Sequence, residues 1–383
     1  TVKPLSGSES DGRSQVLFAT TDGGPSLQEL VADFNDGQAE FEVKLVPAGE
    51  QATADCFQGP RSVDFATVPS ELLSLQPQLE ADSSFSLTDF PDRFLEAYRY
   101  QGGLWGIPVQ AQVRVIYYNR ALFDVLDLIH PEVGWTTTDF QERALALHQA
   151  GYYSYLPLDG EVIDLVAWLT LLGAYPWNAD GQPRFDAPDV VAATTQYAQY
   201  LAQQPDGTPY RLIPTMEDRE DRLSLVRKGL VGMWSDDSGV RPSSELGLPD
   251  SSIGLIPLPT GTHMVSDLVY EGLFIAANSD QVVPCWEWMK YLSSHYMPTR
   301  GVPARNTILT SSSFAAQVGD ETWHTYSALL EAVDIRTIYA PDVRAEQAPY
   351  LLDALVKVLQ GTSTAHALTT AQQFAAATQP ESR

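Results

Sequence analysis

The amino-terminal part of the chain alternates between short apolar runs and an amphipathic stretch. Residues 16–20 form a short apolar run that predicts a buried strand, and residues 41–46 alternate apolar and polar positions, as a half-buried strand does. Between these runs, apolar residues recur at helical spacing: Leu27, Leu30, Val31 and Phe34. Residues 63–68 predict a further strand. Strands and helices in this order predict a mostly parallel α/β sheet.

The rest of the chain continues this mixed pattern. Apolar faces predict later helices at residues 122–128, 138–150, 162–173, 190–203, 284–294 and 349–360. Apolar or alternating runs predict later strands at residues 106–118, 229–234, 252–257 and 273–277. Residues 1–15 are rich in Ser and Gly and predict a flexible amino-terminal tether. Five tryptophans lie in or near the predicted elements and are expected to pack in the core: Trp105, Trp135, Trp168, Trp286 and Trp288.

Composition and charge narrow the classes of function. Apolar residues make up 44% of the 383 residues, which is enough for a full core. The chain carries 49 Asp and Glu against 23 Lys and Arg, so its formal net charge is −26. Such a surface repels phosphate backbones and anionic lipids, so we do not expect nucleic-acid or membrane-surface binding as its main role. The longest apolar stretch is too short to span a bilayer, and the start at Thr1 without a leader indicates a processed form.

The residue types that most often carry chemistry form no catalytic or metal-binding motif. Nucleotide-binding, zinc-protease and serine-hydrolase motifs are absent, and the six histidines lack ligand spacing, so we expect no metal and no cofactor. The only cysteines are Cys56 and Cys285, and neither belongs to a Cys-x-x-Cys pair. They predict either one disulfide in an oxidising compartment or two separate buried thiols. Acidic residues are plentiful, so the carboxylate pair of a glycan hydrolase stays an alternative.

Four separated segments carry the most information about function. Residues 98–123 contain Gly-Leu-Trp-Gly-Ile-Pro and a strand ending in Tyr-Tyr-Asn, and residues 225–235 end in Gly-Met-Trp-Ser. The third segment joins residues 253–261, 271–279 and 285–293, and the fourth, 301–306, reads Gly-Val-Pro-Ala-Arg-Asn. In this order they resemble the extracellular solute-binding proteins of bacterial ABC importers, in the carbohydrate branch with maltose-, oligosaccharide- and glycerol-3-phosphate-binding proteins. The resemblance runs from residue 16 to residue 376.

This resemblance implies a type II two-lobe periplasmic-binding-protein fold, in which a ligand cleft lies between α/β lobes joined by hinge crossings. It places residues 16–110 and 274–309 in lobe one and residues 111–273 and 311–383 in lobe two. It also implies a monomeric periplasmic or extracellular lipoprotein that is not an enzyme. Such a protein binds a carbohydrate and delivers it to the transmembrane subunits of an ABC permease. A phosphorylated polyol is the alternative ligand, supported by Arg114, Arg241 and Arg305.

Strand geometry and loop position indicate the first candidate ligand-binding residues. Gln110, Gln112 and Arg114 alternate with apolar residues, so they share one face of a strand and either line a cleft or face solvent. Open α/β sheets bind ligands at the loops that follow their strands. Those loops carry five further candidates: Thr20, Thr21, Asp22, Ser70 and Glu71. Asp22 serves equally well as a turn or capping residue.

The resemblance adds the remaining candidates. Trp234 and Asp236 follow a predicted buried strand, where the family pattern favours a sugar ring stacked on the indole. A core position for Trp234 is the alternative. The other candidates are Asp159, Glu161, Tyr270, Glu271, Arg305 and Tyr350. Helix capping explains Asp159 and Glu161 equally well.

Overall fold

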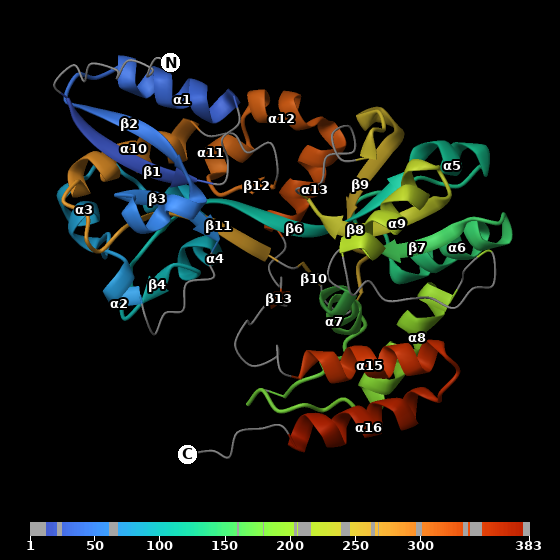
Figure 1. Cartoon of the computed structure of the whole chain (residues 1–383). Coiled ribbons are helices and arrows are strands. Elements are labelled where there is room, and N and C mark those ends of the chain that lie inside the picture. Colours follow the sequence, from blue (N-terminus) through green and yellow to red (C-terminus); the bar gives the residue numbers. More distant parts are fainter. Residues whose placement is uncertain are drawn as a thin grey trace, which may run out of the picture. The chain divides into compact units, whose positions relative to one another are not determined.

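The computed structural model describes residues 13–20, 25–60, 68–158, 161–178, 180–202, 205, 216–238, 246–261, 265–266, 268–295, 301–331, 336–337 and 347–377. These residues form α-helices and a mixed β-sheet (Figure 1). The chain divides into two compact units, each assembled from separate stretches of sequence. Unit 1 contains Thr1–Ala111, Val269–Pro298 and Val302–Phe314, and unit 2 contains Gln112–Leu268, Thr299–Gly301 and Ala315–Arg383.

The sheet of unit 1 is mixed in direction. β1 (Ser14–Thr20) runs parallel to β2 (Phe41–Pro47) on one side and to β3 (Cys56–Pro60) on the other. β11 (Leu268–Ile275) runs antiparallel to β3 and is followed in the sheet by β6 (Ile107–Asn119). The short strand β12 (Val302–Pro303) pairs antiparallel with β6, whereas β4 (Arg99–Tyr100) and β5 (Gly103–Leu104) form a separate antiparallel pair. Because β1 and β3 are parallel, their carboxyl ends lie at the same edge of the sheet.

Helices pack against this sheet, and an aromatic cluster joins two of them to it. The helices of unit 1 are α1 (Pro25–Asp36), α2 (Val68–Glu71), α3 (Gln76–Ala81), α4 (Asp92–Glu96), α10 (Val282–His295) and α11 (Asn306–Leu309). The division between the units falls within α12 (Ser312–Val318). Trp288 of α10 is fully buried, and its ring lies 5.6 Å from Phe18 of β1 and 5.2 Å from Phe34 of α1. These contacts place α10 and α1 against the strands.

Unit 2 is built on a second group of strands. β8 (Val231–Asp237) runs parallel to β7 (Tyr153–Pro157) and antiparallel to β6, and β6 also pairs with β9 (Ile253–Pro257). A small parallel pair joins β10 (Val265–Ser266) and β13 (Arg336–Thr337). The helices are α5 (Arg120–Val125), α6 (Thr137–Gln149), α7 (Glu161–Leu171), α8 (Pro188–Ala202), α9 (Met216–Arg227), α13 (Asp320–Glu331), α15 (Ala348–Leu359) and α16 (Thr364–Ala377). Its core gathers around Trp168, where α7, α8 and α15 pack together.

Most of the predicted elements are confirmed, with three differences. The helix predicted at 122–128 ends at Val125, because Asp127 adopts a left-handed φ of 54° that a helix does not continue through. The predicted tether is wrong at Ser14 and Gln15, which pair with β2 as part of β1, whereas residues 1–12 lie outside the described residues. The strand predicted at 63–68 falls mainly outside them too, and Val68 begins α2.

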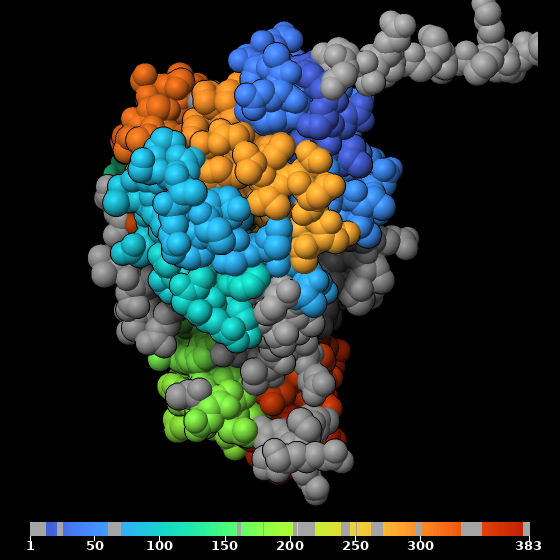
Figure 2. Space-filling model, turned by 90° about the vertical axis from the view of Figure 1, so that its left-hand side faces the viewer, coloured from blue at the N-terminus to red at the C-terminus, as the bar shows by residue number. Residues whose placement is uncertain are grey.

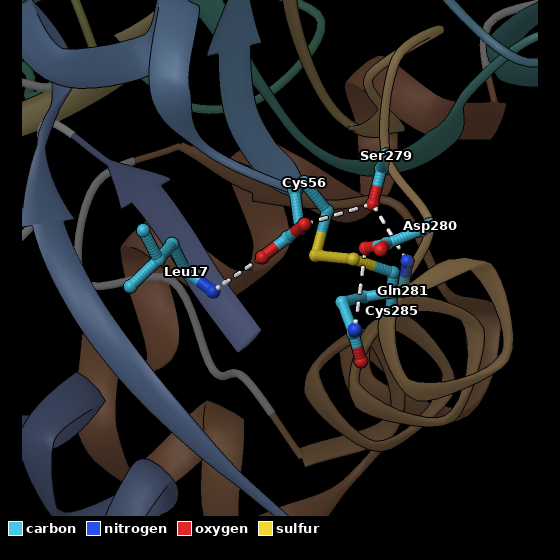
Figure 3. The surroundings of a disulfide bond; sticks show 7 residues. Leu17, Cys56, Ser279, Asp280, Gln281 and Cys285 are labelled. Carbon is cyan, nitrogen blue, oxygen red and sulfur yellow. Dashed lines mark hydrogen bonds between the residues drawn. A yellow bond between two sulfur atoms is a disulfide. The ribbon is translucent and has the colours of Figure 1, made fainter. Parts of the chain in front are cut away.

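A disulfide joins the start of β3 to α10. Cys56 and Cys285 are both fully buried, and their Cα atoms are 6.0 Å apart, within the range that the bond requires. Figure 3 shows Leu17 and Ser279 beside this bond. The Asp55 carboxylate accepts hydrogen bonds from Leu17 N at 2.9 Å and from Ser279 Oγ at 2.9 Å. Of the two alternatives that the sequence allows, the structure has the disulfide.

Asp82 fixes the segment before β4 to α10. Its carboxylate accepts hydrogen bonds from Lys290 Nζ at 2.6 Å and from Trp286 Nε1 at 3.0 Å. Figure 2 shows the surface of α10 lying against the surface of this segment. The hydrogen bond from Lys290, with smaller contributions from Ser84 and Trp286, holds the pKa of the Asp82 carboxyl far below its usual range.

We expect this pair to make stability depend on pH in the acidic range. A folded pKa below the unfolded value gives stability that is present above about pH 4 and is lost as the pH falls toward the folded pKa. Asp82→Asn should therefore lower the melting temperature at pH 7, and the difference from the wild type should shrink below about pH 4. Thermal melts across this range check the prediction. Asp353→Asn, which removes a carboxylate that is 59% exposed, is the control and should change little. A gap that stays constant at all pH values contradicts the prediction.

Candidate functional site

A group of polar side chains lies together in unit 1, and we call it the Glu271 cluster. Glu271 of β11 accepts hydrogen bonds at one carboxylate oxygen from Gln58 Nε2 of β3 at 3.0 Å and from Gln110 Nε2 of β6 at 2.5 Å. Thr20, the last residue of β1, donates from Oγ1 to Gln58 Oε1 at 3.4 Å. Four strands thus bring four polar side chains together, and three of them were predicted from the sequence.

The Glu271 cluster is rich in hydrogen-bond acceptors. Thr20, Gln58 and Gln110 are each about 5% exposed or less, and Glu271 is half-buried. Gln110 Oε1 is buried without a hydrogen-bond partner among the described residues. No described cationic side chain contacts the Glu271 carboxylate by hydrogen bond or ion pair. The cluster therefore suits a ligand that donates hydrogen bonds, such as one with hydroxyl groups.

A second polar group is buried in unit 2, and we call it the Asp164 cluster. Asp164 of α7 is fully buried, and its carboxylate accepts hydrogen bonds from Tyr155 at 2.9 Å, from Tyr197 at 2.7 Å and from Ser235 at 2.5 Å. Arg114 Nη1 lies 3.6 Å from the same carboxylate. Burial and the neighbouring Asp164 charge raise the pKa of the Tyr155 phenol well above its usual range, so that phenol stays protonated and donates.

An ion pair and an arginine–carbonyl hydrogen bond lie at the carboxyl ends of β8 and β7. Asp236 is fully buried and forms an ion pair with Arg219 of α9 at 3.0 Å. Arg222 of the same helix donates to the carbonyl of Pro157, the last residue of β7, at 2.6 Å. Arg219 and Arg222 are thus both paired with oxygen atoms of unit 2, a carboxylate and a backbone carbonyl respectively.

Trp234 is a core residue in this structure. It is 0% exposed, and its ring stacks on Tyr117 of the neighbouring strand at 5.8 Å with an interplanar angle of 13°. Its burial supports the alternative interpretation, in which Trp234 packs in the core. Contact between Trp234 and a ligand stays a prediction.

Arg305 and Tyr350 make packing contacts rather than joining either cluster. Arg305 donates to Asp89 at 3.1 Å and to Ser293 at 2.9 Å, and its guanidinium lies over the Phe90 ring at 4.5 Å. Tyr350 of α15 is half-buried, and its ring stacks on Phe374 of α16 at 6.2 Å. The guanidinium of Arg305 is thus neutralised and buried within unit 1.

The remaining predicted residues divide into two groups. Gln112 is half-buried in β6, and Ser70 and Glu71 are exposed at the end of α2, so none of them belongs to the hydrogen-bonded clusters described above. The others lie outside the described residues, either entirely or in their side chains: Thr21, Asp22, Asp159, Glu161 and Tyr270. The ligand contacts predicted for both groups stay predictions.

Sequence reasoning missed Gln58 and most of the Asp164 cluster. Gln58 lies in a five-residue strand that includes Gly and Pro and shows no clear alternation. Asp164 did carry a signal, because it is an acidic residue inside an otherwise apolar helical run, where an isolated charge is costly. A buried carboxylate at such a position requires donors from other elements. The partners themselves, Tyr197 and Ser235, could not be identified without the fold.

Two absences hold for the described residues. Among them, no group of three or more His, Cys, Asp or Glu side chains could hold a metal ion. In the same part of the chain, every helix is too short or too polar to cross a membrane.

The sequence matches a known family and several solved structures. The family model of bacterial extracellular solute-binding proteins matches residues 19–295. A binding protein from Brucella abortus strain 2308 is 24% identical over 222 residues, covering 53% of this chain and 51% of that protein, so the chain spans about half the length of the curated relatives it matches.

Two solved structures share the fold over nearly all of the chain. An ABC substrate-binding protein from Listeria monocytogenes in complex with cycloalternan has 16% identity and a TM-score of 0.70, covering 96% of this chain and 99% of that one. UgpB from Mycobacterium tuberculosis in complex with glycerophosphocholine has 16% identity and a TM-score of 0.71, covering 96% and 98%. The predicted two-lobe α/β fold class is confirmed. The chain therefore belongs to the bacterial extracellular solute-binding proteins, whose family and fold are those of binding proteins.

Proposed function

We propose that this protein is the extracytoplasmic substrate-binding component of an ABC importer and that its ligand is a neutral carbohydrate or polyol. The observation that carries this proposal is the Glu271 cluster. Its polar groups are acceptors and amides that match hydroxyl donors, and a carboxylate at its centre repels an anionic ligand. The loaded protein then delivers its ligand to the transmembrane subunits of the permease as a monomer.

The cations that a phosphorylated ligand would need are engaged elsewhere. Arg305 forms an ion pair with Asp89, and its guanidinium lies over the rings of Phe85 and Phe90. Arg114 lies beside the Asp164 carboxylate. Arg241, the third cation that supported this alternative, lies outside the described residues. A phosphate would have to compete with the Asp164 carboxylate for Arg114 and with the Asp89 carboxylate for Arg305. This argument favours a ligand without a phosphate group over a phosphodiester such as the glycerophosphocholine that UgpB binds.

A thermal-shift screen with maltotriose, mannitol and glycerophosphocholine tests the ligand class. A ligand at 100 times its dissociation constant adds about 2.7 kcal/mol, which raises the melting temperature by several degrees. We expect the shift with maltotriose or mannitol, and we expect it to persist at high salt because the ligand is uncharged. A larger shift with glycerophosphocholine that disappears at high salt would favour the phosphorylated alternative.

A substitution at the centre of the cluster tests the site. Glu271→Gln keeps the shape of the side chain and removes its charge, so hydroxyl donors lose a charge-assisted hydrogen bond. We expect about a tenfold loss of carbohydrate affinity by calorimetry, with little change in the melting temperature without ligand. Glu287→Gln is the matched control, because Glu287 lies on α10 and is 44% exposed. Equal affinities for both variants contradict the assignment of Glu271 to the site.

A further inference from the structure

One loop of unit 2 exposes several large apolar side chains close together in sequence. Residues 124–133, which we call the 124–133 loop, comprise the last two residues of α5 and the segment that follows it toward α6. Val125 and Ile129 are each 76% exposed and Val133 is 44% exposed. Few other large apolar side chains in the described part of the chain reach this exposure. Apolar side chains displayed in this way commonly mark an interaction surface.

Hydrogen bonds fix the loop rather than leaving it to move freely. His130 Nε2 lies 3.0 Å from Asp124 Oδ1, and His130 Nδ1 lies 3.3 Å from the Tyr118 hydroxyl. The His130 ring also packs edge-on against Phe123 of α5 at 5.8 Å. The loop therefore contacts α5 through His130, and the exposed apolar side chains extend from an ordered stretch of backbone. Such a surface binds with little ordering cost.

A pocket adjoins the loop within unit 2. Its volume is about 470 Å³, large enough for a protein side chain. The 124–133 loop contributes His130, Pro131, Glu132 and Val133, and the rest of the wall includes Tyr118 and Arg120, Ile256 of β9, and Glu321 and His324 of α13. Figure 1 shows β6, α5, β9 and α13, which contribute residues to the pocket wall. An apolar side chain that contacts Val133 could enter here.

The charges around this surface are predominantly acidic. The loop carries Asp124, Asp127 and Glu132 and no Lys or Arg, and α13 adds Asp320. Arg120, the cation in the pocket wall, forms an ion pair with Glu321. A second copy of this chain would present the same acidic surface and carries a net charge of −26, so self-association through this face is disfavoured. Anionic lipid headgroups are disfavoured for the same reason.

We propose that the 124–133 loop and its pocket form a docking surface for the extracytoplasmic face of the importer's membrane subunit. The complementary surface on that subunit carries an apolar side chain surrounded by Lys or Arg. This proposal rests on the proposed function. It goes beyond that function by assigning the residues that contact the importer, and these are separate from the Glu271 and Asp164 clusters.

The test uses the full chain and its importer reconstituted in phosphatidylcholine proteoliposomes, with ATP hydrolysis as the readout. The protein is loaded with maltotriose or mannitol, whichever gives the larger melting shift. Val125→Ser with Ile129→Ser removes the apolar contact, and Glu132→Lys reverses a rim charge without touching Asp127, whose left-handed backbone resists substitution. Val283→Ser is the matched control, since Val283 is 66% exposed on α10 of unit 1.

We expect both loop variants to need about tenfold more protein for half-maximal stimulation, at unchanged carbohydrate affinity and unchanged melting temperature. Val283→Ser should behave as the wild type. Stimulation by the loop variants at wild-type concentrations overturns the docking proposal, and so does a wild-type dimer that the double variant dissociates. A lowered melting temperature in both loop variants also overturns it, because the residues would then be folding contacts. A wild type that binds neither carbohydrate instead refutes the proposed function, and the docking proposal falls with it.

Discussion

Trp234→Ala is expected to lower the free energy of unfolding by about 3–5 kcal/mol, because it removes a fully buried indole and leaves a cavity. Trp234 lies in β8, where it pairs with Tyr117 of β6 and with Leu156 of β7, and its ring stacks on Tyr117. At about 2–4 °C per kcal/mol, the melting temperature without ligand should fall by about 10 °C. Denaturant and thermal unfolding of the purified variant measure both quantities.

Trp234→Phe is the matched variant for this prediction. Phenylalanine keeps a ring against Tyr117 and fills most of the space, so its loss of stability should be clearly smaller than that of the alanine variant. Indole Nε1 makes no hydrogen bond among the described residues, so neither variant leaves a donor or acceptor unpaired there. If Trp234→Ala instead melts as the wild type does and binds carbohydrate more weakly, the indole is a ligand platform and the core assignment is wrong.

The periodicity of the chain predicted most of the elements because burial imposes it. α7 buries an apolar face around Trp168, and β1 buries Val16 and Phe18, so their apolar positions repeat as the geometry of each element requires. Four of the five tryptophans predicted as core residues are buried, and Trp105 is half-buried. Pattern alone was sufficient where an element presents one continuous face to the core.

Pattern was not sufficient where a contact depends on the register between distant strands. Gln58 and Gln110 meet Glu271 across separations of 213 and 161 residues. That contact follows from the antiparallel pairing of β11 with β3, in which Glu271 lies opposite Pro60 and Leu273 opposite Gln58. A shift of one residue would turn Glu271 to the other face of the sheet. Family resemblance identified Glu271 as a candidate, but no feature of the sequence identified its partner Gln58.

Family resemblance also singled out residues whose surroundings only the fold reveals. Arg305 occurs in a segment typical of the family, yet its guanidinium is held by Asp89 and Ser293. Nothing in the sequence near Arg305 indicates Asp89, which lies 216 residues earlier. The assignment of residues to the two lobes, with boundaries near residues 110, 273 and 309, stays a prediction.

Removing the disulfide is expected to cost about 2–5 kcal/mol of unfolding free energy. Cys56 and Cys285 are 229 residues apart, so the bond closes a long loop and restricts the unfolded chain. The double variant Cys56→Ala with Cys285→Ala should therefore melt several degrees below the wild type, while its carbohydrate affinity stays unchanged. Calorimetry and ligand titration of the folded protein measure these two effects.

Reductant supplies an independent test of the same bond. Both cysteines are buried, so a reductant should reach the disulfide only when the chain unfolds. Dithiothreitol should therefore lower the melting temperature of the wild type toward that of the double variant. The double variant, which has no thiols, should melt identically with and without reductant. Thiol labelling of the unfolded wild type should find no reactive cysteine until reductant is added. Two reactive thiols without reductant would mean separate buried cysteines, the alternative that the sequence left open, and the loss of stability would then reflect only the two small cavities.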